Sequence, residues 1–144
     1  MPGLRSISVQ GCHDVTDGAV HALAAECPGI VHVNFARCLK ITTDAVVALA
    51  NQQAGQLAYV NFSGCPDVLD GALTALARTC SELSAVDFSD CPKLTEVAAK
   101  RLIKTCPQLM HTNFRGCKNI KSGLWDDRTA ASASWATMMS SQKL

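Results

Sequence analysis

The chain has 144 residues, of which 48% are hydrophobic and 17% charged, and thirteen basic against twelve acidic side chains give a formal net charge of +1. No apolar run approaches the ~20 residues of a membrane-spanning helix, which excludes a bilayer span. Lysine and arginine are scattered along the chain, so nucleic acid is not expected as the main partner.

Five cysteines recur every 26 or 27 residues and divide the chain into copies of one unit, which start near residues 4, 30, 57, 83 and 109. Ahead of each cysteine, apolar residues alternate with polar ones, as expected for a short strand with one buried face. The aligned columns are Leu4, Ile30, Leu57, Leu83, Leu109; Ile7, Val33, Val60, Val86, Thr112; Val9, Phe35, Phe62, Phe88, Phe114; and Cys12, Cys38, Cys65, Cys91, Cys117.

The second half of each unit carries apolar residues at helical spacing, as at Val68, Leu73 and Leu76 in the third copy. Prolines at 28 and 107 follow the expected helix ends, where a helix cannot continue. One extra residue within 51–56 predicts a bulge or looser helix end in the second copy. Side-chain oxygens at the expected helix starts predict caps on those helices, at Thr16, Asp17, Thr42, Thr43, Asp70, Thr95 and Glu96.

One strand and one helix of this size cannot bury their apolar stripes alone, so the copies are expected to stack. The predicted fold is a right-handed α/β solenoid, with parallel strands on the concave face and helices on the convex face. We expect the repeats to occupy residues 1–124 and a separate tail to occupy residues 125–144.

The frame Leu-Arg-Ser-Ile-Ser-Val-Gln-Gly-Cys at 4–12, which recurs as Leu-Ala-Tyr-Val-Asn-Phe-Ser-Gly-Cys at 57–65, resembles the cysteine-containing subfamily of leucine-rich repeats. The resemblance covers residues 4 to 124. It implies a protein-recognition solenoid of the kind found in F-box ubiquitin-ligase adaptors, and in cell-cycle and ciliary or axonemal assembly proteins.

The eight cysteines could indicate disulfides, a metal site or buried thiols. Five form the repeat column, and Cys27, Cys80 and Cys106 each follow their column cysteine by 15 residues, at the helix end. Equivalent positions of this kind favour small buried residues, and no two cysteines are closer than 11 residues, unlike the close pairs of zinc sites. We therefore expect free buried thiols in a reducing compartment, most simply the cytoplasm, although an organelle or axoneme stays open.

Nothing in the sequence predicts catalysis or a cofactor. The four histidines have no metal-binding spacing, and nucleotide-binding and nucleophile motifs are absent. The glycines ahead of the column cysteines are explained by a tight turn.

Polar side chains between the apolar strand positions are expected to form the concave surface, where a partner protein would bind. Short polar residues could also simply fit a crowded strand face and bond one another, and this alternative stays open. The predicted partner-binding residues are His32, Asn34, Tyr59, Asn61, Asp87, His111, Asn113 and Arg115.

The ends of the chain give the remaining expectations. The first strand begins at Leu4 with no capping segment ahead of it, so a partner, a second copy of the chain or further sequence is expected to cover this end. In the tail, Trp125, Trp135, Met138 and Met139 are expected to cap the solenoid or to dock on a partner.

Two functions follow from these observations. The favoured one is a non-catalytic accessory or scaffold subunit of a larger protein assembly. The alternative is the substrate-recognition repeat domain of an F-box-type adaptor, with the ubiquitin-ligase scaffold recruited through another chain or segment, because the helical domain that precedes the repeats in those adaptors is not in this sequence.

Overall fold

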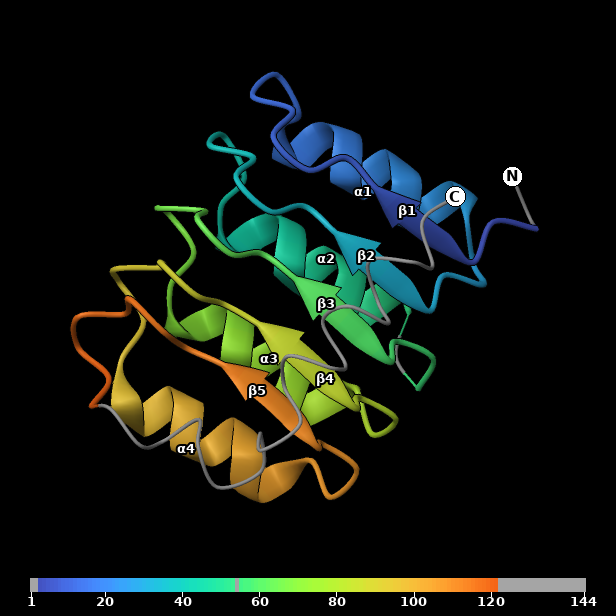
Figure 1. The fold of residues 1–144 in the computed structure, drawn as a ribbon. Coiled ribbons are helices and arrows are strands. Elements are labelled where there is room, and N and C mark those ends of the chain that lie inside the picture. Colours follow the sequence, from blue (N-terminus) through green and yellow to red (C-terminus); the bar gives the residue numbers. More distant parts are fainter. Residues whose placement is uncertain (1–2, 54, 122–144) are drawn as a thin grey trace.

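A computed structural model describes residues 3–53 and 55–121. Strands and helices alternate along the whole described chain, as the repeat pattern predicts (Figure 1). The elements are β1 (Ser6–Ser8), α1 (Asp17–Glu26), β2 (His32–Asn34), α2 (Thr43–Gln52), β3 (Tyr59–Asn61), α3 (Asp70–Thr79), β4 (Ala85–Asp87), α4 (Glu96–Thr105) and β5 (His111–Asn113).

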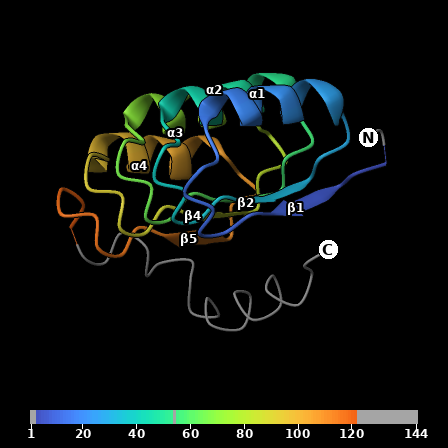
Figure 2. The same cartoon turned by 90° about the horizontal axis from the view of Figure 1, so that it is seen from above.

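The five strands form one parallel sheet in sequence order. Its register pairs Ile7 with Val33, Val33 with Val60, and so on to Thr112, which is the alignment that the cysteine period predicts. All four helices lie on one side of the sheet (Figure 2). The fold is therefore the expected right-handed α/β solenoid, and helices α1 to α4 leave the opposite face of the sheet free of described helices.

The core lies between the sheet and the helices and runs the length of the stack. Its centre is a ladder of four buried rings, with centroids 5.6 Å apart for Phe35 and Phe62, 6.0 Å for Phe62 and Phe88, and 6.1 Å for Phe88 and Phe114. Each ring fills the same place in its own repeat, so every coil buries the apolar surface of its neighbours.

The first side chains of the four helices, Asp17, Thr43, Asp70 and Glu96, accept hydrogen bonds from the next repeat, which corrects the expectation that they cap their own helices. Asp17 accepts from the backbone N–H and the hydroxyl of Thr42, at 2.8 and 2.6 Å. Asp70 accepts the same pair of bonds from Thr95, at 2.8 and 2.6 Å. Thr16 and Thr95 make no side-chain cap bond, and Thr42 alone among the expected caps accepts from its own helix, from the N–H of Asp44.

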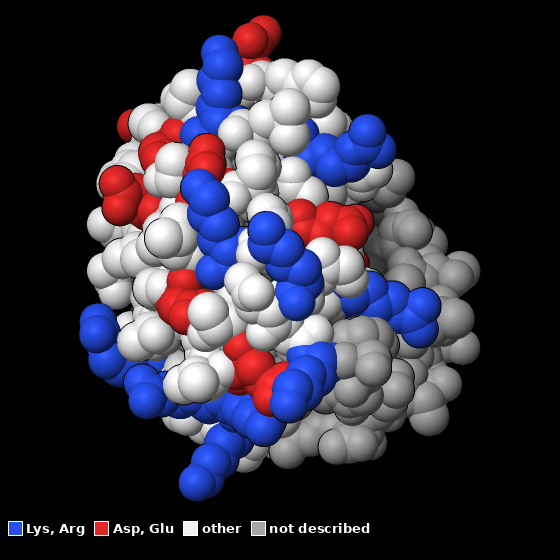
Figure 3. Space-filling model, turned by 90° about the vertical axis from the view of Figure 1, so that its left-hand side faces the viewer, with Lys and Arg blue, Asp and Glu red and all other residues white. Residues whose placement is uncertain are grey.

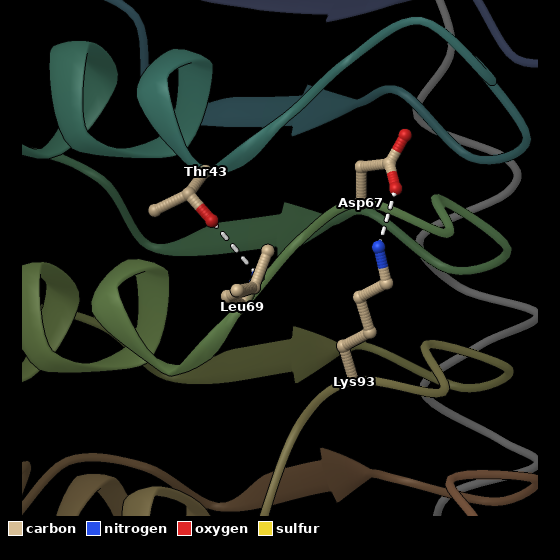
Figure 4. A network of polar contacts seen from close by, with 4 residues as sticks. All are labelled: Thr43, Asp67, Leu69 and Lys93. Atoms are coloured by element: carbon tan, nitrogen blue, oxygen red, sulfur yellow. Dashed lines mark hydrogen bonds and ion pairs between the residues drawn. The ribbon is translucent and has the colours of Figure 1, made fainter.

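The other two repeats use the same position with different chemistry. The hydroxyl of Thr43 accepts the N–H of Leu69 at 2.8 Å, and Glu96 accepts the N–H of Lys121 at 2.9 Å. Figure 4 shows Thr43 at the start of α2 pointing toward Leu69, the residue ahead of α3. The first residue of α1, α2 and α3 thus accepts a hydrogen bond from the residue that precedes the next helix, and Glu96 of α4 accepts one at the equivalent position of the fifth repeat.

Replacing Asp70 by alanine is expected to lower the free energy of unfolding by about 1–3 kcal/mol, because two donors of Thr95 lose their acceptor in a half-buried site. Asp44 is the matched control: it is an exposed acidic residue in the first turn of α2, and its alanine variant should change stability by less than about 0.5 kcal/mol. Urea unfolding measures both. Equal effects of the two substitutions would contradict an inter-repeat role.

The predicted irregularity of the second repeat falls at a buried glutamine. Gln53 occupies the place of the helix-end cysteines and is fully buried. Its amide nitrogen donates to the carbonyls of Ala24 at 3.0 Å and Cys27 at 2.8 Å, at the end of α1. The glutamine therefore satisfies carbonyls that the end of a helix leaves without intrahelical partners.

All eight cysteines are free, and seven of them are buried, as predicted. The column thiols of the later repeats also donate to a carbonyl of the preceding repeat: Cys65 to Phe35 at 3.3 Å, Cys91 to Phe62 at 3.2 Å and Cys117 to Phe88 at 3.1 Å. Cys12 is exposed, which corrects the prediction of a uniformly buried column. No described repeat precedes Cys12 to cover it.

A thiol reagent is therefore expected to modify one cysteine quickly, Cys12, and the other seven only on unfolding. Burial raises the pKa of the Cys65 thiol to about 11. Moving from about pH 7 to about pH 9 should leave it almost wholly protonated, and hence slow, because the thiolate is the reactive form. Titration with a chromogenic disulfide measures the fast fraction. The Cys12→Ser variant should lose that fraction, and a second fast equivalent would contradict the burial.

Candidate functional site: the sheet face opposite the helices

The face of the sheet opposite helices α1 to α4 carries two columns of side chains in register. The first column is Ser6, His32, Tyr59, Ala85 and His111, and the second is Ser8, Asn34, Asn61, Asp87 and Asn113. The structure therefore brings the predicted partner-binding residues of all four later strands onto one surface, which we call the concave face. Arg115 lies beyond β5 and is exposed.

The second column has a structural role that limits what it can offer a ligand. In each of four repeats its side-chain oxygen accepts the backbone N–H two residues later: Asn34 from Ala36 at 3.0 Å, Asn61 from Ser63 at 2.9 Å, Asp87 from Ser89 at 3.0 Å and Asn113 from Arg115 at 3.0 Å. These bonds hold the chain as it leaves the strand. The side-chain oxygens of this column thus already accept hydrogen bonds, and they accept them from backbone N–H groups of their own repeat.

The side-chain nitrogens of the column bond across the face. Asn34 donates to Gln10 at 3.2 Å, Asn61 to the Tyr59 hydroxyl at 3.0 Å and Asn113 to Asp87 at 3.4 Å. Each asparagine has two amide protons, so it keeps a second donor beyond the bond named here. A partner would find donors along this column more readily than acceptors.

Asp87 departs from the asparagines of its column and carries the face's carboxylate. Burial raises its pKa, while hydrogen bonds from Ser89 and Asn113 act in the opposite direction and lower it. The Ser89 hydroxyl donates at 2.7 Å to the same oxygen that accepts the Ser89 N–H. The Ser89 N–H, the Ser89 hydroxyl and the Asn113 amide all donate to Asp87. A carboxylate, which only accepts hydrogen bonds, therefore matches its neighbours at this position.

The first column is less exposed than expected. Tyr59 is 9% exposed and the neighbouring Ala85 is 4% exposed, whereas His32 and His111 are half-buried. Burial raises the pKa of Tyr59 to about 12 and lowers the pKa of His32 and His111. Tyr59 lies on the predicted face, but it is less exposed than the prediction of a binding residue requires. At neutral pH this column is uncharged and presents hydrogen-bonding rings.

The rim beyond the strands contains two strained residues. The position before each column cysteine has a left-handed backbone, filled by glycine at Gly11, Gly64 and Gly116 but by Arg37 at φ 61° and Asp90 at φ 56°. Side chains here carry a conformational cost that glycine avoids. The non-glycine residues lie over glycines of the next repeat, since a Cβ on Gly64 would meet Arg37 and one on Gly116 would meet Asp90.

Gly116→Ala should therefore destabilise the protein by about 1 kcal/mol from the left-handed backbone and by about 1–2 kcal/mol more because Asp90 must move. Gly11→Ala is the matched control, with the same backbone conformation and open space around it, and should cost about 1 kcal/mol. Thermal and urea unfolding compare the two. Adding Asp90→Gly to Gly116→Ala should remove the excess, and a persistent excess would rule out this contact.

The predicted tail contacts, Trp125, Trp135, Met138 and Met139, lie outside the described residues. Within the described ranges, no helix is long and apolar enough to cross a membrane. Residues 3–53 and 55–121 also contain no group of three His, Cys, Asp or Glu side chains able to hold a metal ion.

The charges are not scattered, which corrects the sequence-based expectation. Residues 93–121 contain seven basic side chains and one acidic side chain, Glu96, whereas residues 3–92 contain nine acidic and four basic ones. Figure 3 shows the basic side chains gathering toward the lower end of its view, where the fourth and fifth repeats lie. Counting charge repeat by repeat, instead of by strand or helix, would have found this gradient in the sequence.

Comparison with known proteins supports the fold. No family model matches the chain. A curated protein of Eremothecium gossypii, antagonist of mitotic exit network protein 1, is 37% identical over 83 residues, which are 56% of this chain and 20% of that protein. The chain thus spans about one fifth of the length of this relative.

Three solved structures have the same architecture. A chain of the yeast Rad7 and Elc1 complex superposes with a TM-score of 0.73 at 18% identity, over 81% of this chain and 29% of that one. Leiomodin-1 actin-binding site 2 gives 0.66 at 11% identity, over 98% and 90% of the two chains. The tropomodulin C-terminal domain of Caenorhabditis elegans gives 0.66 at 10% identity, over 97% and 88%. The protein is thus a leucine-rich repeat solenoid of about five repeats.

Proposed function

We propose that this chain is a non-catalytic protein-interaction module that serves as an accessory or scaffold subunit of a larger protein assembly. The observation that carries the proposal is the concave face: five strands in register present uncharged rings and amide donors on the side of the sheet opposite helices α1 to α4. Fold neighbours taken from one protein complex and from an actin-binding site support an interaction role.

The concave face offers a partner three kinds of contact. His32 and His111 supply ring nitrogens at the two sides of the face, and Arg115 supplies an exposed cation at its rim. The column Asn34, Asn61, Asp87 and Asn113 shapes the surface and supplies the remaining amide protons. Tyr59 contributes through its hydroxyl, which Asn61 already contacts.

The first repeat and the tail would provide further contacts with a partner. Ile7 and Val9 are partly exposed, whereas Val33 and Phe35, their counterparts in the second repeat, are buried, so a partner that covers β1 would bury additional apolar surface. Trp125, Trp135, Met138 and Met139 supply large apolar side chains for the same purpose.

The cysteine column supports membership of the cysteine-containing leucine-rich repeat subfamily. Its thiols donate to the preceding repeat, a role that gives a cysteine at this position a physical reason. This membership is also what favours the alternative, a substrate-recognition domain of F-box type. Free buried thiols favour a reducing compartment, and we propose a cytoplasmic location.

Affinity capture of the tagged full chain from its own cells tests the proposal with two variants. The concave variant combines His32→Ala, His111→Ala and Arg115→Ala. The matched control combines His21→Ala, Lys40→Ala and Arg78→Ala, which are exposed residues outside the concave face. Bound proteins should be lost from the concave variant and kept by the control, with both variants folded by circular dichroism.

The size of the captured species separates the two functions. Elution of the chain within one stable large complex supports a structural subunit. Recovery with ubiquitin-ligase components and a changing set of soluble proteins would favour the recognition domain instead. Equal binding by both variants would remove the concave face from the proposal.

A further inference from the structure

The outer side of α4 carries a short basic stripe. Val97, Lys100, Arg101 and Lys104 follow the i, i+3, i+4, i+7 spacing that places side chains on one side of a helix. All four are exposed, and Val97 is 69% exposed, whereas Ala98, Ala99 and Leu102 on the other side are buried in the core. We call these four residues the α4 stripe.

The repeat architecture does not require such a stripe. The twelve aligned positions of the other helices contain one basic residue. They are Gly18, His21, Ala22 and Ala25 in α1; Asp44, Val47, Ala48 and Asn51 in α2; and Gly71, Thr74, Ala75 and Arg78 in α3. Ala75, which aligns with Arg101, is buried in the core and Val47 packs against it, whereas all four α4 positions are exposed. The three cations of α4 are therefore a departure in both charge and exposure.

Local helix stability explains only part of the departure. Lys100 forms an ion pair with Glu96 at 3.2 Å, and Lys104 in the last turn complements the helix dipole, as Arg78 does in α3. Neither reason applies to Arg101, which forms no hydrogen bond or ion pair within the described ranges. Local helix stability also does not explain why the exposed residue among these cations is a valine.

The surrounding charge strengthens the stripe. The one carboxylate of residues 93–121, Glu96, is already engaged by the N–H of Lys121 and by Lys100, and these contacts lower its pKa. Because the nearest cations share one end of the solenoid, their fields add and attract negative charge toward α4 (Figure 3).

We infer that the α4 stripe docks an acidic segment of a partner protein, with carboxylates on the three cations and an apolar side chain on Val97. A protein segment fits better than nucleic acid. The stripe is only about 10 Å long, and the sole Phe, Tyr or Trp of residues 93–121 is the buried Phe114, so no such ring is exposed for base stacking. The stripe lies on the helix side, so both surfaces can be occupied together.

Fluorescence anisotropy tests this with a labelled synthetic peptide of glutamates that carries one leucine per helical turn. Combining Lys100→Glu, Arg101→Glu and Lys104→Glu should weaken binding at least about tenfold. The matched control combines Arg5→Glu, Arg37→Glu and Lys40→Glu, which changes net charge equally at exposed sites in the first two repeats, and should weaken it less than about threefold. Val97→Ser should weaken binding about threefold with no change in charge.

The outcomes separate this docking from the concave face. The triple alanine variant of His32, His111 and Arg115 should retain most of the peptide binding, so failure of one proposal leaves the other standing. Equal losses in the α4 variant and its charge-matched control would overturn the α4 stripe, as would absence of peptide binding. Tighter α4-dependent binding of duplex DNA or of anionic lipid vesicles would overturn it in favour of that ligand.

Discussion

Replacing Phe62 by alanine is expected to lower the free energy of unfolding by about 3–5 kcal/mol. Phe62 is fully buried and lies between Phe35 and Phe88, with ring centroids 5.6 and 6.0 Å away. Removing its ring deletes the contacts of two neighbouring repeats at once and leaves a cavity that the stacked coils cannot close without sliding against each other. Urea unfolding followed by circular dichroism measures the change.

The leucine variant at the same position is the control for this loss. Phe62→Leu keeps most of the buried volume and should cost about 1–1.5 kcal/mol. A loss below about 1 kcal/mol for the alanine variant would mean that the ladder of rings does not hold adjacent repeats together.

Replacing Gln53 by glutamate should destabilise the protein by about 3–5 kcal/mol near neutral pH. The amide nitrogen that donates to Ala24 and Cys27 would become an oxygen facing two carbonyl oxygens in a fully buried site. A carboxylate there has neither water nor a counter-charge, so burial would raise its folded-state pKa above the unfolded value of about 4.3.

The penalty should therefore depend on pH in one direction. Below the unfolded pKa the side chain is protonated in both states, and the variant should lose only about 1 kcal/mol for its missing second donor. As pH rises toward the folded pKa, the unfolded state ionises first and stability falls. Gln56→Glu is the matched control, because Gln56 donates to Pro28 at 3.0 Å from an exposed position and its variant should lose little at any pH. A penalty independent of pH would contradict a buried charge.

The sequence alone predicts the repeat frame well, and the reason is physical. Each column of the alignment must fill an equivalent place in every coil, so Phe35, Phe62, Phe88 and Phe114 report the same packing four times. The strand register and the burial of seven cysteines follow from the same repetition.

The sequence predicts the contacts between repeats less well, because the spacing of the cysteines does not show with which repeat a polar side chain forms its hydrogen bond. Asp70 has the position of a helix cap, yet its carboxylate serves Thr95 in the next coil. The extra residue within 51–56 predicts a bulge or looser helix end, but the period does not indicate that the Gln53 side chain bonds the end of α1. The sequence pattern places Cys12 and Tyr59 in the correct columns but does not give their exposure, so Cys12 is more exposed and Tyr59 less exposed than predicted.

The side-chain bonds between repeats described here share one direction. Thr95 donates a hydrogen bond to Asp70, Cys91 donates one to Phe62, and Gln53 donates one to Cys27. In each case the donor belongs to the later repeat and the acceptor to the earlier one. Damage from a lost acceptor should therefore appear one coil further along the chain than the substitution itself. A substitution that removes an acceptor in one repeat is therefore expected to cause local unfolding in the repeat that follows it.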